Sequence, residues 1–190
     1  MSLEFAGKDI LLSRVDQAVQ AGSPEAITDA LRVALCELFG NPAIQLPDCV
    51  FDYSADHYRR RLLHQDDRLG YSIMAMTWAP AQGTAIHDHA GMWCVEAVWQ
   101  GEIEVQQYEL MEQRDNRFRL ERRTVMRTGI GSAGSLIPPH EYHTIANPNS
   151  ERPAVTLHIY EGSMNQCSAF QPLGQNWYQR ESRTLQLDAA

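Results

Sequence analysis

The pattern of hydrophobic and polar positions divides the chain into a helical first part and a β-rich remainder. Apolar residues recur at helical spacing over residues 8–21 and 25–39. Ser23 followed by Pro24 is typical of an N-cap and first helical position, and Gly40 is typical of a helix end. The sequence therefore predicts two N-terminal helices.

From residue 70 onward the apolar residues form short runs separated by glycine and proline. Many short runs at this spacing predict a β-sandwich or a small barrel. Residues 55–64 fit either a short helix or the irregular start of a strand. The expected strands are Tyr71–Trp78, Thr84–His89, Cys94–Gln100, Ile103–Glu109, Arg117–Thr124, Ser135–Pro138, His143–Asn147 and Ala154–Tyr160.

A chain of 190 residues with 44% hydrophobic residues is the size of one ordinary globular domain. We expect one domain over residues 1–190, with a helical part at about 1–65 and a β-barrel at about 70–165. The net charge of −8 disfavours nucleic acid and anionic membranes as partners. Nothing in the pattern indicates an oligomeric state.

No apolar stretch approaches the length of a membrane-spanning helix, and the N-terminus lacks the basic and apolar segments of a signal peptide. We therefore expect a cytoplasmic protein. The four cysteines contain no CxxC pair, so we expect reduced thiols rather than structural disulfides.

The run His87-Asp88-His89 carries the most informative chemistry of the chain. Two residues at positions i and i+2 of a strand point to the same face, so both imidazoles can bind one metal ion. His143 follows in a segment that is expected to be a partner strand. Three neutral imidazoles suit iron, copper, nickel or zinc, so the ligand set alone leaves the metal open.

The spacing of these histidines resembles the two motifs of cupins, which are small β-barrels. Gly101 stands twelve residues after His89, as the first motif requires. Pro138, His143 and Asn147 match the second motif. The resemblance implies a mainly β fold, a double-stranded β-helix or jelly-roll-like cupin barrel, with the N-terminal helices added to it.

Two positions depart from the cupin motifs. His140 occupies the glycine position of the second motif, and Cys94 occupies the glutamate position of the first. Without that glutamate, three histidines remain as the expected ligands. Glu96 lies two residues beyond Cys94 and shares its strand face, so it is an alternative ligand.

Thr156, His158 and Tyr160 alternate along one expected strand and so share one of its faces. A hydroxyl, an imidazole and a phenol in a row can form a hydrogen-bonded relay that fixes the histidine tautomer and orients the phenol. The positions between them are apolar, so the alternative is an outward polar face of an antiparallel strand.

Three segments together resemble the cysteine dioxygenase family, thiol dioxygenases of the cupin superfamily: HDH followed by Cys94, the strand TLHIY, and the longer stretch RPAVTLHIYEGSMNQCSAF. The resemblance covers about residues 50–172 and indicates a bacterial member. It implies an Fe(II) ion held by His87, His89 and His143. It also implies a relay of Thr156, His158 and Tyr160, and a thioether crosslink between Cys94 and Tyr160.

The resemblance further implies a substrate pocket. Arg60 matches the arginine that binds the substrate carboxylate, although a shift of register would put Arg59 or Arg61 in its place. The other positions that match the family's pocket are Tyr58, Trp78, Thr156 and Cys167. Bacterial relatives that oxidise 3-mercaptopropionate have glutamine and glycine where this chain has Arg60 and Cys94.

The expected function is therefore an iron-dependent thiol dioxygenase of cysteine catabolism, which converts L-cysteine and O2 to cysteine sulfinate. One alternative is a dioxygenase for another thiol carboxylate, 3-mercaptopropionate or mercaptosuccinate. A second is a cupin isomerase or a nickel or zinc cupin. A third is a non-enzymatic cupin that binds a metal and a small ligand.

Overall fold

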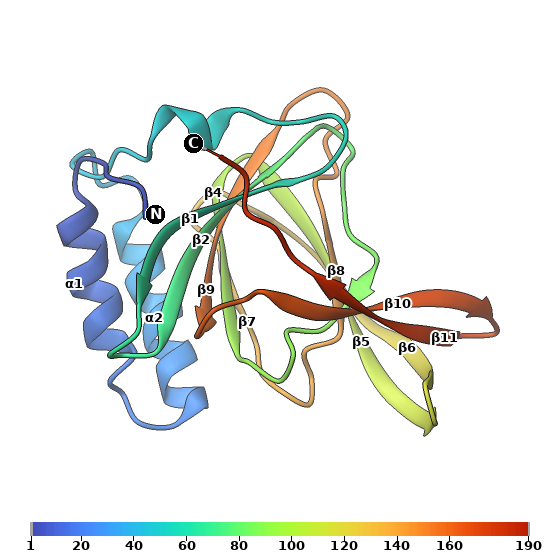
Figure 1. Cartoon of the computed structure of the whole chain (residues 1–190). Coiled ribbons are helices and arrows are strands. Elements are labelled where there is room, and N and C mark those ends of the chain that lie inside the picture. Colours follow the sequence, from blue (N-terminus) through green and yellow to red (C-terminus); the bar gives the residue numbers. More distant parts are fainter. Residues whose placement is uncertain (1, 190) are drawn as a thin grey trace.

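The computed structural model describes residues 2–189, and within them lie two α-helices, one short 3-10 helix and eleven strands (Figure 1). The helices are α1 (Lys8–Ala18), α2 (Pro24–Leu38) and η1 (Asp48–Phe51). The strands are β1 (Arg59–Asp66), β2 (Tyr71–Trp78), β3 (Ile86–His87), β4 (Cys94–Gln100), β5 (Glu102–Arg114), β6 (Arg117–Gly129), β7 (Ala133–Leu136), β8 (His143–Ala146), β9 (Ala154–Glu161), β10 (Gln166–Gly174) and β11 (Trp177–Thr184).

Both predicted helices are present, with small shifts at their ends. The Ser23 side chain accepts a hydrogen bond from the Ala26 amide at 3.3 Å, and Pro24 is the first helical residue of α2. Helix α1 ends at Ala18, three residues before the predicted end. Its last predicted residues instead form the turn that leads into the cap of α2.

The strands form two sheets that together make the barrel. One sheet has the order β1-β2-β9-β4-β7, and the other closes on itself in the order β10-β11-β6-β5-β8-β3. Helices α1 and α2 lie against the outer side of the first sheet (Figure 1). This arrangement gives the first sheet an outer face toward the helices and an inner face toward the barrel interior.

Strand β9 is central in its sheet and is buried on both faces over 154–160. Leu157 and Ile159 belong to the same apolar cluster as Leu31 and Leu35 of α2. The polar residues that alternate with them therefore point into the barrel. This burial excludes the alternative in which that row forms an outward polar face.

The β-structure extends beyond the predicted limits of 70–165 at both ends. Residues 59–66 form β1, which pairs antiparallel with β2, so the segment 55–64 contains a strand rather than a helix. At the other end, β10 and β11 form a hairpin that reaches Thr184. These strands are rich in charged or exposed side chains, which is why alternation of apolar residues did not reveal them.

No helix within residues 2–189 has both the length and the apolar character needed to cross a membrane. All four cysteines are free thiols, and two of them, Cys94 and Cys167, are buried in the barrel. Two of the four thiols are therefore in the interior of the barrel.

Candidate metal centre

The three histidines of the expected metal site meet inside the barrel. His87 ends β3 and lies directly opposite His143, the first residue of β8. The ring centroids are 4.2 Å apart for His87 and His143, and 4.9 Å apart for His89 and His143. One nitrogen of each ring lies within 4.8 Å of the others, a spacing at which a single ion can contact all three.

His89 reaches this cluster from a turn, because β3 ends at His87 and does not continue over the predicted Thr84–His89. The Asp88 carboxylate accepts hydrogen bonds from the amides of Ala90 at 3.1 Å and Ser168 at 2.8 Å. These bonds turn the chain sharply, and Ala90 adopts a positive φ of 55°. The two histidines therefore converge through an Asp88-centred turn rather than through strand alternation.

The histidine nitrogens fit a divalent metal ion. The ring Nδ1 atoms of His87 and His143 lie 3.2 Å and 2.7 Å from the backbone carbonyls of Ala85 and Glu141, contacts that direct each Nε2 to the interior. Both His89 nitrogens and His143 Nε2 are buried without a hydrogen-bond partner among the described residues. A bound metal cation would satisfy the lone pairs of these buried rings.

Burial also keeps two of these rings neutral, because removal from water disfavours the charged form. Desolvation, with a smaller contribution from neighbouring His143, lowers the pKa of His87 to about 3. The same causes lower the pKa of His89 well below its usual value. Neutral imidazoles are the form that coordinates a metal.

A hydrogen-bonded row runs along the inner face of β9. Trp78 Nε1 donates to Thr156 Oγ1 at 2.9 Å, and Thr156 Oγ1 lies 2.7 Å from His158 Nε2. His158 Nδ1 lies 3.3 Å from the Tyr160 hydroxyl. Since the Thr156 hydroxyl accepts from the indole, its own proton is available for His158 Nε2, which leaves the His158 proton on Nδ1.

Cys94 and Tyr160 face one another across the β4–β9 pair, in direct register. Both side chains are buried. Burial raises the pKa of the Cys94 thiol and of the Tyr160 phenol, so both groups keep their protons at neutral pH. The Tyr160 ring centroid is 5.3 Å from that of His89, which places the phenol beside the histidine cluster.

A cavity of about 270 Å³ adjoins this cluster. Arg60 lies in its wall and is 3% exposed. Arg60 Nη1 donates to the Gln186 carbonyl at 3.1 Å, and Nη2 donates to the Met164 carbonyl at 2.9 Å. Five of the predicted site residues line the cavity: Tyr58, Arg60, His87, Tyr160 and Cys167.

The neighbouring arginines take other positions. Arg61 points to the opposite side of β1, where its guanidinium donates to the carbonyls of Asp52 at 3.2 Å and Ala189 at 3.3 Å. Arg59 is not among the residues that line the cavity. Arg183, which sequence reasoning missed because it lies on the unpredicted strand β11, does line it.

Two residues that were predicted to bind substrate lie behind the cavity rather than in its wall. Trp78 is fully buried and stacks on Tyr58 with a centroid distance of 4.8 Å. Thr156 lines a different cavity. Their contact with a substrate stays a prediction, and in the structure they support Tyr58 and His158.

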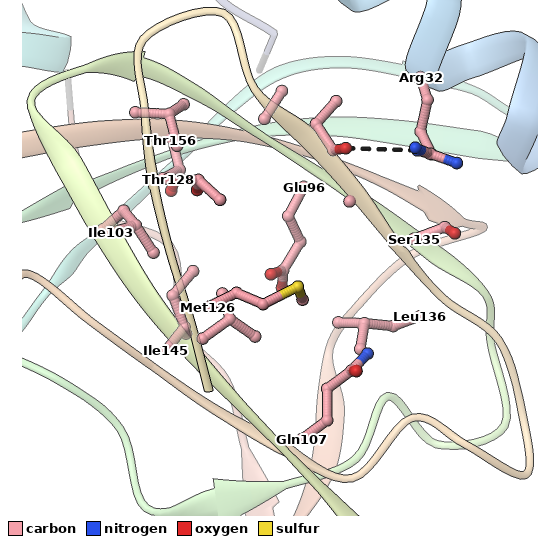
Figure 2. Close-up of a pocket in the computed structure, with 15 residues that line it drawn as sticks. Arg32, Glu96, Ile103, Gln107, Met126, Thr128, Ser135, Leu136, Ile145 and Thr156 are labelled. Atoms are coloured by element: carbon pink, nitrogen blue, oxygen red, sulfur yellow. Dashed lines mark hydrogen bonds between the residues drawn. The ribbon is translucent and has the colours of Figure 1, made fainter. Parts of the chain in front are cut away.

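This second cavity, also about 270 Å³, shares no lining residue with the first. Its wall is largely apolar and comes mostly from strands β4 to β8, with Thr156 of β9 and Arg32 of α2 completing it. The Glu96 side chain projects into it (Figure 2). Glu96 Oε1 lies 3.3 Å from His143 Nε2 and 3.2 Å from His158 Nδ1. Alternation along strand β4 predicted that Glu96 shares the face of Cys94, but it could not predict that the Glu96 carboxylate reaches both histidine rings.

Comparison with known proteins adds three findings. The family described as "Cysteine dioxygenase type I" matches residues 49–172. Cysteine dioxygenase type 1 of Rattus norvegicus is 24% identical over 164 residues, which cover 77% of this chain and 80% of the rat protein. The Bos taurus protein of the same name is 23% identical over 166 residues, which cover 87% of this chain and 72% of the bovine protein.

Among solved structures, a protein with a double-stranded β-helix domain from Klebsiella pneumoniae superimposes with a TM-score of 0.51 at 17% identity. The match covers 68% of this chain and 92% of that protein. This likeness concerns the fold alone. It confirms the predicted mainly β, cupin-type barrel with two helices at its N-terminal side.

Proposed function

Because this chain belongs to the cysteine dioxygenase type I family, we propose that it is an iron-dependent thiol dioxygenase that oxidises L-cysteine to cysteine sulfinate. One observation carries the proposal: a buried cluster of three histidines adjoins a small cavity whose wall contains both an arginine and a relay-supported tyrosine. Such a cavity suits a small thiol that carries a carboxylate.

In this proposal His87, His89 and His143 hold the ferrous ion through their inward nitrogens. A ferrous ion held by these residues would supply the redox chemistry for the reaction of dioxygen with a thiolate sulfur. The three neutral imidazoles would add no negative charge of their own to the site, which favours an anionic sulfur as the substrate group. Addition of both atoms of O2 to the sulfur gives the sulfinic acid.

Arg60 binds the substrate carboxylate in the proposed reaction. Its Nε atom is buried and has no hydrogen-bond partner among the described residues, so the guanidinium keeps donor capacity for a ligand. A guanidinium and a carboxylate form strong, charge-assisted hydrogen bonds. The carbonyls of Met164 and Gln186 fix the Arg60 side chain in place before the substrate arrives.

Tyr160 hydrogen-bonds the reacting sulfur or oxygen atoms. Tyr160 lines the cavity, and its hydroxyl is oriented by His158, which in turn is held by Thr156. The raised pKa of Tyr160 keeps it protonated and therefore able to donate a hydrogen bond. Cys94 restricts the movement of the phenol from the opposite strand.

A second arginine makes mercaptosuccinate the second candidate substrate. Arg183 lines the same cavity as Arg60 and lies on its exposed side. Two guanidinium groups suit a thiol with two carboxylates.

In an oxygen-uptake assay of the Fe(II)-loaded protein with L-cysteine, 3-mercaptopropionate and mercaptosuccinate, we expect the highest kcat/KM with L-cysteine. If only another thiol supports oxygen uptake, the proposed metal site stands and that thiol replaces L-cysteine as the proposed substrate.

We also expect a thioether between Cys94 Sγ and a ring carbon of Tyr160 to form during turnover. The bond forms with loss of two hydrogen atoms, whose electrons and protons reduce O2. After turnover with thiol and oxygen, intact mass should fall by two hydrogens and a faster gel band should appear. Cys94→Ala should show neither change, and Cys167→Ala should show both. An unchanged mass in the wild-type protein after turnover would exclude the crosslink.

A further inference from the structure

Glu96 is a buried carboxylate for which the proposed reaction has no role. It lies on β4, opposite His158 of β9, and is 8% exposed. Its Oε1 atom lies 3.3 Å from His143 Nε2 and 3.2 Å from His158 Nδ1, inside the barrel. A charged carboxylate in the interior is costly unless cations or hydrogen-bond donors surround it.

The His143 ring cannot supply a donor while it is neutral. Its Nδ1 atom is 2.7 Å from the Glu141 carbonyl, which can only accept a hydrogen bond, so the ring proton lies on Nδ1. The Nε2 atom then has a lone pair and faces Glu96 Oε1 at 3.3 Å. A lone pair and a carboxylate oxygen repel each other at this distance unless a cation lies next to both.

The His158 ring does not satisfy Glu96 either. Its Nδ1 atom is 3.2 Å from Oε1, but the contact lacks the alignment of a hydrogen bond, and Oε1 has no hydrogen-bond partner among residues 2–189. The remaining surroundings of the carboxylate are the largely apolar cavity in Figure 2, whose wall includes Ile145 and Met126. Protein groups alone therefore leave Oε1 without a partner.

The distance from Oε1 to His143 Nε2 matches that between two ligands of one metal ion. Metal–nitrogen and metal–oxygen bonds to such ligands are about 2.0–2.2 Å long, so neighbouring ligand atoms lie about 3.0–3.4 Å apart. A ligand oxygen of Glu96 is also within 4.8 Å of a His89 nitrogen. The carboxylate thus stands at the edge of the histidine cluster on the side of the second cavity.

We propose that Glu96 is a fourth protein ligand of the metal, in addition to His87, His89 and His143. This inference rests on the proposed metal site but does not depend on the identity of the thiol. A carboxylate ligand lowers the net charge of the site by one and leaves one fewer position for small molecules than three histidines would. It also gives the site a carboxylate ligand, as the first cupin motif does. Here the carboxylate comes from a position two residues beyond Cys94 on the same strand face.

The test uses the full chain loaded with Co(II), whose visible absorption reports its ligand set. Glu96→Gln should weaken Co(II) affinity at least about ten-fold and change the absorption bands. The exposed Glu102→Gln is the matched control and should behave as wild type. His158→Gln tests whether Glu96 acts only through that ring, and we expect it to leave the absorption bands largely unchanged.

Wild-type affinity and absorption in Glu96→Gln would overturn the proposal, as would the same spectral change in Glu96→Gln and His158→Gln. If Glu96→Gln does not fold, X-ray absorption of the wild-type Co(II) protein decides the question. A fit with three nitrogen ligands and a carboxylate supports the proposal, and a fit without a carboxylate refutes it. Neither measurement involves a thiol, so a failure of the proposed function would not affect them.

Discussion

Replacing His143 with alanine should abolish metal retention and, with it, thiol oxidation. His143 is the first residue of β8 and lies opposite His87. Its Nε2 atom lies 3.3 Å from Glu96 Oε1 and is buried without a hydrogen-bond partner among the described residues. Loss of this ligand should weaken the affinity for Fe(II) at least about 100-fold, because loss of a mere supporting contact already costs 10- to 100-fold. Metal content after gel filtration with a chelator, measured together with oxygen uptake, checks both effects.

His140→Ala is the matched control, because His140 lies three residues earlier, in the loop before β8, and is exposed. It should keep the metal and the activity. Circular dichroism and the thermal midpoint should show that His143→Ala still folds, since only one buried side chain is shortened. A folded His143→Ala protein with full metal content or full activity would remove His143 from the site.

Replacing Arg60 with glutamine should selectively reduce the oxidation of thiols that carry a carboxylate. The guanidinium is held by two backbone carbonyls and keeps an unpaired Nε. A buried hydrogen bond to a charged group contributes about 1.5–3 kcal/mol, so kcat/KM for L-cysteine should fall on the order of 100-fold. If Arg60 binds the ground state and the transition state equally, KM should rise and kcat should stay nearly the same. If Arg60 also positions the sulfur, kcat should fall as well.

Cysteamine, which has a thiol but no carboxylate, gives the internal control. Its slow oxidation should be nearly the same in the wild type and Arg60→Gln. Arg59→Gln is the control variant, because Arg59 is on the same strand but is not among the residues lining the cavity. Equal losses with L-cysteine and cysteamine in Arg60→Gln would show that Arg60 supports the structure instead of binding the carboxylate.

The regular elements could be predicted where their apolar pattern was strong. Strands β2 and β4 were predicted with their observed limits, because each is a mostly apolar run bounded by glycine, proline or a turn. Strand β11 was missed, and the segment of β1 was left open between a helix and the start of a strand, because arginines and other polar residues dominate both. In β1, Arg60 and Arg61 are buried by contacts with distant carbonyls, and a local pattern cannot reveal such contacts.

In the candidate site too, the features that depend on the spacing of neighbouring residues could be predicted, and those that depend on contacts between distant segments could not. The spacing of His87 and His89 indicated convergence, although the Asp88 turn that produces it depends on the distant Ser168 amide. Strand alternation predicted that Thr156, His158 and Tyr160 share one face, but only the burial of both faces of β9 shows that this face is inside the barrel. The reach of Glu96 to two rings depends on the separation of strands β4, β8 and β9, which only the folded barrel fixes.

The most direct test of thiol dioxygenase activity is to supply the Fe(II)-loaded protein with L-cysteine under labelled dioxygen, ¹⁸O₂, and to identify the product by mass. The proposed function predicts oxygen consumption and a cysteine sulfinate in which both sulfinate oxygens carry the label. If the iron-loaded protein consumes no oxygen with L-cysteine, 3-mercaptopropionate or mercaptosuccinate, or if the product contains no label from dioxygen, the protein is not a thiol dioxygenase for these substrates.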